Sequence, residues 1–232
     1  MNIKNYNDFI CVLLGAGFSM GVGSYHGIFA VYPYSWDDLA PYDTPIRWHT
    51  GNPETDPWEW RMRILDERKD IAYSKVFLKK SGYITKEWYP YFLAVRRGTR
   101  EFDEEYYNGT ASQYAKRIYE VISKHDSLPL HVIKQLAGFG KEDKTKFENA
   151  LVELQMKMYI TMCGRQKKVS QMGMEYGWPS TVFCTVEKFW DDDVFVKAAS
   201  ISEQDAIEKI KSQIIKLNPQ VESKKILKFI TG

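Results

Sequence analysis

The segment from Gln113 to Val186 constrains the fold more than any other part of this 232-residue chain. Its apolar residues recur at helical spacing in three stretches and then form two short runs that are typical of strands. We therefore predict helices over 112–124, from Pro129 onward and over 144–157, and strands over 159–163 and 181–186. Three helices followed by a hairpin are the order of a winged helix-turn-helix.

Positive charge is concentrated on this segment. The whole chain has a formal net charge of only +2. Residues 111–170, however, hold eleven Lys and Arg against six Asp and Glu, a local excess of five positive charges. Such a distribution is typical of a surface that binds a phosphate backbone, and double-stranded DNA is the expected partner. A winged helix used for packing or for protein contacts is the alternative.

Candidate DNA contacts lie on the third helix and on the hairpin. Asp143 is the expected cap of that helix, and Phe147, Leu151, Leu154 and Met158 are expected to face inward. Amide side chains on its outer face suit adenine edges, and basic side chains suit phosphates. The candidates are Lys144, Lys146, Asn149 and Gln155 on the helix and Arg165, Lys167 and Lys168 at the tip of the hairpin.

The rest of the chain predicts shorter elements. Glycine and proline are frequent in residues 1–51, among them Gly27, Pro33 and Pro41, so regular structure there should be short. We predict helices over 6–14, 58–68, 71–80, 85–97, 203–217 and 222–230, and a linker over 100–110. The expected regions are 1–105, which is rich in aromatic residues, the winged helix over 111–190, and a helical extension over 191–232. The fold class is α+β, mainly helical with small antiparallel sheets.

A second candidate site lies around Trp58-Glu-Trp-Arg-Met-Arg63. Its two tryptophans suit base stacking, and Arg61 and Arg63 suit phosphate binding. If the protein is an enzyme, the candidate acids and bases are Glu59, Asp56 and His49. The alternative is structural: Trp58 packs in the core, Arg61 pairs with a neighbouring acid, and Asp56 and Pro57 begin the helix.

Several classes of protein are not expected. Cys11, Cys163 and Cys184 show no metal-binding or disulfide spacing, and the four histidines lie far apart, so we predict reduced thiols and no metal. The glycine cluster around Gly15 has no helix pattern after it, which argues against a nucleotide cofactor. The apolar segment 9–18 is too short to cross a bilayer and lacks the positive charges that precede a signal peptide, so a cytoplasmic protein without membrane contact is expected.

Four blocks of sequence resemble a known family. They are Trp48-His-Thr-Gly-Asn-Pro-Glu-Thr-Asp-Pro-Trp-Glu-Trp-Arg61, Gly82-Tyr-Ile-Thr-Lys-Glu-Trp-Tyr-Pro-Tyr91, Leu136-Ala-Gly-Phe-Gly140 and Tyr176-Gly-Trp-Pro-Ser-Thr-Val-Phe183. Over about residues 48–190 the chain resembles bacterial AlkZ-related proteins, which are similar to the YcaQ/AlkZ winged-helix DNA glycosylases. The resemblance implies tandem winged-helix units and a DNA partner. The Gln-x-Gln motif with which those glycosylases remove alkylated bases does not occur in this sequence, so no catalytic residue is carried over.

The leading hypothesis is a DNA-binding winged-helix protein that is related to the alkylation-repair glycosylases but lacks their catalytic pair. Two alternatives stay open. One is an active glycosylase with a relocated carboxylate, Glu59 or Asp56. The other is a protein-interaction module, which would expose an apolar patch on the C-terminal helices around Ile210, Ile214, Ile215 and Leu217.

Overall fold

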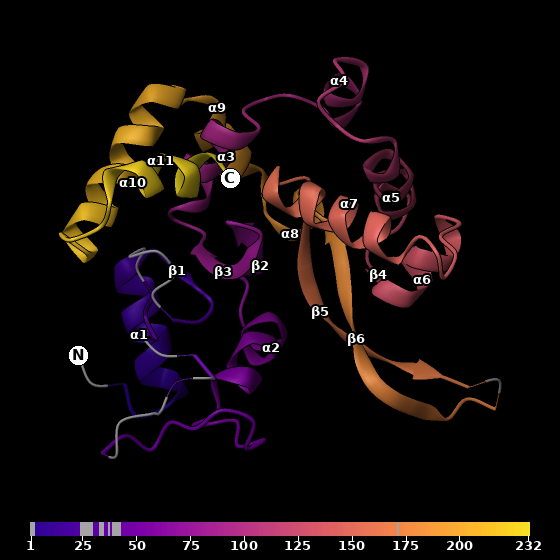
Figure 1. The fold of residues 1–232 in the computed structure, drawn as a ribbon, viewed down its shortest axis with the longest axis horizontal. Coiled ribbons are helices and arrows are strands. Elements are labelled where there is room, and N and C mark those ends of the chain that lie inside the picture. Colours follow the sequence, from indigo (N-terminus) through magenta and orange to yellow (C-terminus); the bar gives the residue numbers. More distant parts are fainter. Residues whose placement is uncertain (1–2, 24–29, 33–34, 37, 39–42, 171) are drawn as a thin grey trace.

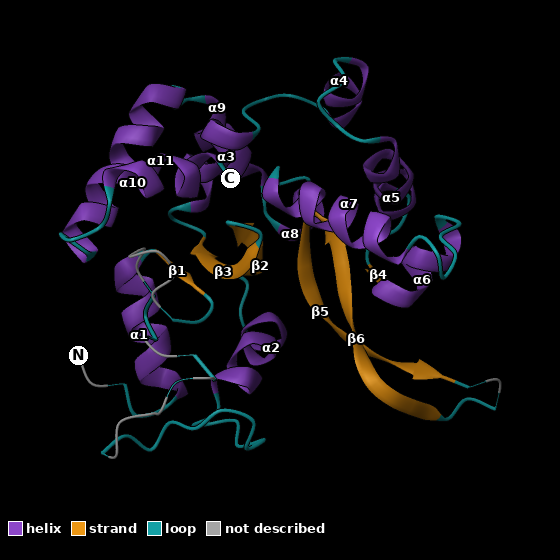
Figure 2. Ribbon diagram, viewed as in Figure 1, coloured by secondary structure: helices purple, strands orange, loops and turns teal. Residues whose placement is uncertain are grey.

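The computed structural model describes residues 3–23, 30–32, 35–36, 38, 43–170 and 172–232 (Figure 1). Helices dominate these residues, and six strands form one antiparallel sheet in the order β1-β3-β2-β5-β6-β4 (Figure 2). The expected α+β class is confirmed. The turn residues Gly27, Pro33 and Pro41 lie outside the described residues. No helix in the described ranges has both the length and the apolar character needed to cross a bilayer.

The described residues of the N-terminal half form three helices and three strands. Helix α2 begins where expected, because the carboxylate of Asp56 accepts the Trp58 N–H at 2.8 Å and Pro57 occupies the first turn. Trp58 remains partly exposed, whereas Trp60 is completely buried. The bounds are α1 Tyr6–Ala16, β1 Phe18–Met20, α2 Pro57–Glu67, β2 Ile71–Phe77, β3 Lys80–Thr85 and α3 Tyr89–Arg96.

The helix predicted over 71–80 is wrong, since these residues form β2 and the turn into β3. Six of the seven β2 residues are buried, so the alternation typical of a half-exposed strand is missing and the apolar run does not distinguish strand from helix. The helix predicted over 85–97 begins later, at Tyr89, because Thr85 is still paired with Ile71 in the sheet.

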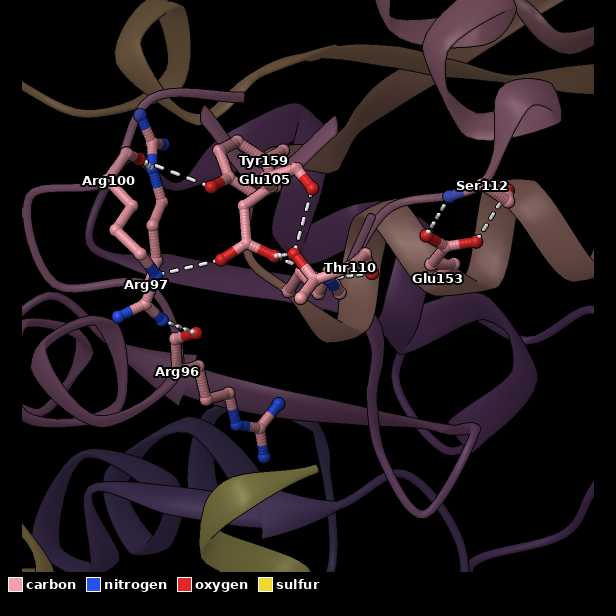
Figure 3. A network of polar contacts seen from close by, with 9 residues as sticks. Arg96, Arg97, Arg100, Glu105, Thr110, Ser112, Glu153 and Tyr159 are labelled. Carbon is pink, nitrogen blue, oxygen red and sulfur yellow. Dashed lines mark hydrogen bonds and ion pairs between the residues drawn. The ribbon is translucent and has the colours of Figure 1, made fainter. Parts of the chain in front are cut away.

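The predicted linker over 100–110 is also partly helical. Helix α4, Phe102–Tyr107, begins with a capping box in which the side chains of Glu101 and Glu104 each bind the other's backbone N–H. A cluster of polar contacts then fastens this helix to the rest of the molecule (Figure 3). Within it the carboxylate of Glu105 accepts hydrogen bonds from Arg100, Lys157 and Thr110.

The three helices expected after residue 111 are present. They are followed by two strands that run further than predicted and form a long hairpin arm projecting from the body (Figure 1). Asp143 precedes the third helix, but its carboxylate accepts the Gly140 N–H and pairs with Lys146 rather than capping. The bounds are α5 Gln113–Ser123, β4 Leu128–Pro129, α6 Leu130–Leu136, α7 Lys144–Met156, β5 Ile160–Val169 and β6 Glu175–Thr185.

The inward residues predicted for α7 are confirmed: Phe147, Leu151 and Leu154 are buried, as is Met158 just beyond the helix. The longer strands change the position of the basic residues, since Arg165, Lys167 and Lys168 lie within β5 and not at the tip of the hairpin. All three cysteines are free thiols, and Cys163 and Cys184 share a hydrogen bond across the hairpin.

The C-terminal helices are α8 Val186–Phe189, α9 Asp192–Ala199, α10 Glu203–Leu217 and α11 Ser223–Thr231. The last two match the prediction. Ile210 and Ile214 are completely buried among side chains of α3, α11 and β2, and Leu217 is partly buried, so only Ile215 of the expected apolar patch is exposed. The patch that would have indicated a protein-interaction module is therefore absent from α10.

The sheet has the same strand pattern in its two halves. Strand β1 pairs with β3 next to the β2–β3 hairpin, and β4 pairs with β6 next to the β5–β6 hairpin. The halves meet at one residue pair, Tyr73 with Met162. Helix α7 packs on β2 and helix α2 packs on β5, so each helix reaches into the opposite half. Because each helix packs on a strand of the opposite half, α2, α7 and the two central strands form one continuous surface.

Candidate nucleic-acid interface

Three adjoining hollows lie along this surface, and we call the surface that they form the central face. Lys75 of β2 lines the first and the third hollow, Trp58 and Arg61 line the first and the second, and Trp178 of β6 lines the second and the third. The shared residues show that the hollows are continuous. Segments separated by more than a hundred residues of sequence therefore contribute to one concave surface.

Five cations that line the central face have no carboxylate partner in the part of the chain that the structure describes: Arg61, Lys75, Lys79, Lys134 and Lys168. The Arg61 guanidinium lies 3.5 Å from the centroid of the Trp58 ring, and its Nε donates to the Trp58 carbonyl at 2.9 Å. Lys168 lies near His131, where burial and then the lysine charge lower the pKa of the imidazole. These cations make the face attractive to an anion.

Aromatic side chains stand beside these cations. The His49 ring lies 4.8 Å from that of Trp58, and both line the second hollow together with Trp178. Trp178 is 91% exposed, an unusual position for so large an apolar side chain. Cations next to exposed aromatic rings are the combination by which proteins hold nucleotides.

Glu59 is the carboxylate of the second hollow. It lies 3.6 Å from the Arg165 guanidinium, which is also 3.4 Å from Asp66. Arg165 is thereby partly neutralised and holds α2 against the hairpin arm. The sequence candidates Glu59, His49, Arg61 and Arg165 thus share one hollow.

Asp56 has a structural position. Its side chain is completely buried and accepts backbone N–H groups from His49, Thr50, Gly51 and Trp58, at distances of 2.7–3.1 Å. This carboxylate fixes the loop before α2 and caps the helix. With both oxygens occupied and no exposed surface, it offers no free oxygen atom to a substrate.

The candidates on α7 are divided among different surfaces. Lys144 lines the third hollow and lies 4.0 Å from Glu148. Lys146 instead pairs with Asp143 at 3.2 Å, and Asn149 lines a further hollow beside Met156. Gln155 is 1% exposed, so the prediction that it reads a base edge is wrong.

Two further basic candidates do not line the central face. Arg63 pairs with Glu54 and Glu67 and lies over the ring of Tyr6, where it holds α2 against α1. Lys167 pairs with Glu175 across the hairpin arm.

Lys75 and Trp178 are two residues of the central face that the sequence does not identify as candidates. Lys75 lies in a segment predicted to be helical, so its position at the junction of the two halves is not expected. Trp178 falls within one of the four sequence blocks that carry the resemblance, without a predicted contact. It is the last of four large apolar side chains at alternate positions, and all four are more than half exposed. This alternation is the sequence signal that could have identified Trp178 as a surface residue. The four residues are Met172, Met174, Tyr176 and Trp178.

Comparison with known proteins identifies a family. A family model described as AlkZ related covers residues 3–231, which is nearly the whole chain and more than the 48–190 expected from the four sequence blocks. No curated protein and no solved structure matches the chain.

Proposed function

We propose that this chain, which belongs to the AlkZ-related family, binds double-stranded DNA across the central face. The observation that carries the proposal is the group of unpaired cations, Arg61, Lys75 and Lys168, on one concave surface. Cations whose charge is not neutralised by neighbouring carboxylates are free to replace the counterions of a phosphate backbone. The exposed rings of Trp58 and Trp178 supply stacking or apolar contact beside them.

We further propose that residues 111–190 act as a winged helix-turn-helix. The order α5-β4-α6-α7-β5-β6, with β4 paired to β6, supports this interpretation. The matching strand pattern of residues 1–105 supports a second, modified unit of the same kind. In this arrangement α7 and α2 occupy equivalent positions in the two units, and residues 191–232 are a helical extension packed on the N-terminal unit.

A salt series tests DNA binding. The affinity of the wild type for a short fluorescent duplex, read by anisotropy, should fall steeply as salt rises. The double variant Lys75→Gln/Lys168→Gln should weaken binding and flatten the slope of log K against log salt by about 1.8, since each phosphate contact contributes about 0.9. The matched control is Lys124→Gln/Lys216→Gln, which removes the same charge from two exposed lysines elsewhere. Equal slopes for the two variants would reject the proposed face.

A second candidate function is hydrolysis of an N-glycosidic bond in DNA. It is favoured by one observation: Glu59, His49, Trp58 and Arg61 line the same hollow, which combines a carboxylate with rings able to hold an unstacked base. In this reaction Glu59 would accept a proton from water as the water oxygen bonds to the sugar carbon and the base departs. Release of free base from alkylated duplex by the wild type, abolished in Glu59→Gln, would support it. Absence of release from a panel of alkylated duplexes that the protein binds would reject it.

A further inference from the structure

A second basic hollow lies next to the C-terminal helix and adjoins the central face at Lys79 and Val152. We call it the C-terminal hollow. Its two adjoining parts, of about 360 and 510 Å³, share Lys79, Met156 and Gly232. Three lysines of its wall, Lys79, Lys224 and Lys228, are exposed and form no ion pair within the described residues. The neighbouring Lys225 is different, because it pairs with Glu222.

The positions of these lysines are unfavourable without a ligand. Lys224 and Lys228 are four residues apart on α11, where like charges repel each other along one helix face. Lys79 belongs to the two-residue turn between β2 and β3, and both turn residues have left-handed backbone angles, with φ of 51° at Leu78 and 61° at Lys79. Such turns favour asparagine and glycine. From this position Lys79 lines the C-terminal hollow and also the first hollow of the central face.

A buried cation lies beneath the same hollow. Arg96 is 7% exposed, and its guanidinium donates to the carbonyls of Ile230 and Phe229, each at 2.8 Å, and to those of Val76 and Met156. In Figure 3 its side chain points away from the Glu105 carboxylate, which binds Arg100 instead. Burial lowers the pKa of Arg96 to about 9, so the guanidinium remains charged at neutral pH.

The acidic side chain of the wall, Glu153, is held by a residue outside the hollow. Glu153 lines the hollow, but its two oxygens accept the backbone N–H and the hydroxyl of Ser112 at 2.9 and 2.7 Å. These contacts, drawn in Figure 3, turn the carboxylate toward the start of α5. Four positive charges therefore converge on a space that is large enough for a phosphate group.

We propose that the C-terminal hollow is a phosphate-binding site, in which Lys79, Lys224 and Lys228 contact the phosphate oxygens above Arg96. The site uses different residues from the proposed DNA contacts at Lys75 and Lys168. The phosphate belongs to the DNA backbone, extending the footprint past α7, or to a free phosphate compound. Both sources present the same oxygens, and the experiment distinguishes them.

The test uses the full chain and the double variant Lys224→Gln/Lys228→Gln, with Lys124→Gln/Lys216→Gln as the charge-matched control. In the first arm, inorganic pyrophosphate is titrated into each protein by calorimetry at constant ionic strength. We expect the wild type and the control to bind equally, and the Lys224/Lys228 variant to bind at least about tenfold more weakly, a loss of 1.4 kcal/mol. In the second arm, the fluorescent duplex is titrated across salt concentrations.

Each result has one meaning. A flatter salt slope for the Lys224/Lys228 variant than for the control identifies the DNA backbone as the source of the phosphate. Weaker pyrophosphate binding by the Lys224/Lys228 variant, with the salt dependence of duplex binding unchanged, identifies a free phosphate compound as the source of the phosphate. If the variant matches the control in both arms, the site is rejected. A rejected phosphate site leaves the Lys75/Lys168 result unaffected, so failure of this inference is separable from failure of the proposed function.

Discussion

The side-chain oxygen of Gln155 accepts a hydrogen bond of 2.8 Å from the Ser74 hydroxyl and so joins α7 to β2 across 81 residues of sequence. The same oxygen accepts the Lys75 N–H at 3.0 Å, and the Gln155 nitrogen donates to the Leu151 carbonyl at 2.9 Å. Within the described residues, the two halves of the sheet are joined by the single strand pair Tyr73 and Met162. Gln155 therefore supplies contacts that hold the halves together next to the central face.

Replacing Gln155 with Leu should destabilise the protein by about 2–3 kcal/mol, because the Ser74 hydroxyl and the Lys75 N–H would be left buried without a partner. Urea denaturation measures this change. Asn149→Leu on the exposed side of α7 is the control and should alter the free energy of unfolding by less than about 0.5 kcal/mol. A similar small effect for both variants would contradict the proposed role of Gln155.

Asp56→Ala should destabilise the protein by about 3 kcal/mol, since it removes a helix cap and leaves three further backbone N–H groups without an acceptor. Glu59→Ala, three residues further along α2, breaks only a half-exposed ion pair with Arg165 and should have an effect below about 1 kcal/mol. Thermal unfolding of the two variants compares them directly. If Asp56→Ala is as stable as the wild type, the buried carboxylate does not stabilise the loop before α2 as its hydrogen bonds indicate.

Glu105 should make the stability depend on acid pH. Burial alone would raise its pKa, but hydrogen bonds from Lys157, Thr110 and Arg100 prevail and lower the pKa from 4.5 to about 2. A lowered folded-state pKa adds stability that is complete above about pH 5 and is lost as pH falls through the folded-state value. Since Arg100 is half exposed, we expect a contribution of about 2 kcal/mol at neutral pH.

The measurement for Glu105 is urea denaturation at a series of pH values between neutrality and about pH 2. Glu105→Gln should lower the free energy of unfolding at neutral pH and reduce its further decline in acid. Glu104→Gln, on the same helix but exposed, serves as the control. A decline in acid that is equally steep in Glu105→Gln and in the wild type would contradict the prediction.

Trp178→Ala should weaken duplex binding by about 1–3 kcal/mol through loss of stacking or apolar contact, while leaving the salt slope unchanged because no charge is removed. Stability should not change, since the side chain is 91% exposed. Tyr107→Ala removes another highly exposed ring, 78% accessible on α4, and should leave binding unaffected. Anisotropy titrations of the two variants test this, and equal affinities would exclude Trp178 from the interface.

The helices that the sequence identifies correctly have a periodic apolar face and a local start signal. In α5 the Ser112 hydroxyl accepts the Ala115 N–H, and in α10 the Ser202 side chain has the equivalent contact. A helix cap and a periodic apolar face depend on residues within one or two turns, so both can be recognised in the sequence without the rest of the chain. The four quoted blocks likewise sufficed for the AlkZ-related resemblance, which the family model confirms.

The sequence by itself thus determined the α+β class, the order of α5, α6, α7 and the hairpin after them, the last two helices of the chain and the family. Only the tertiary structure decided that residues 71–77 form a strand, because β2 is buried between β3 and β5, and β5 lies far away in the chain. It also decided which candidates share a surface: Arg61 and Lys168 join Lys75 and Trp178, whereas Asp56 and Gln155 are used in packing. Strand pairing and surface composition depend on contacts between distant segments, and no local pattern encodes them.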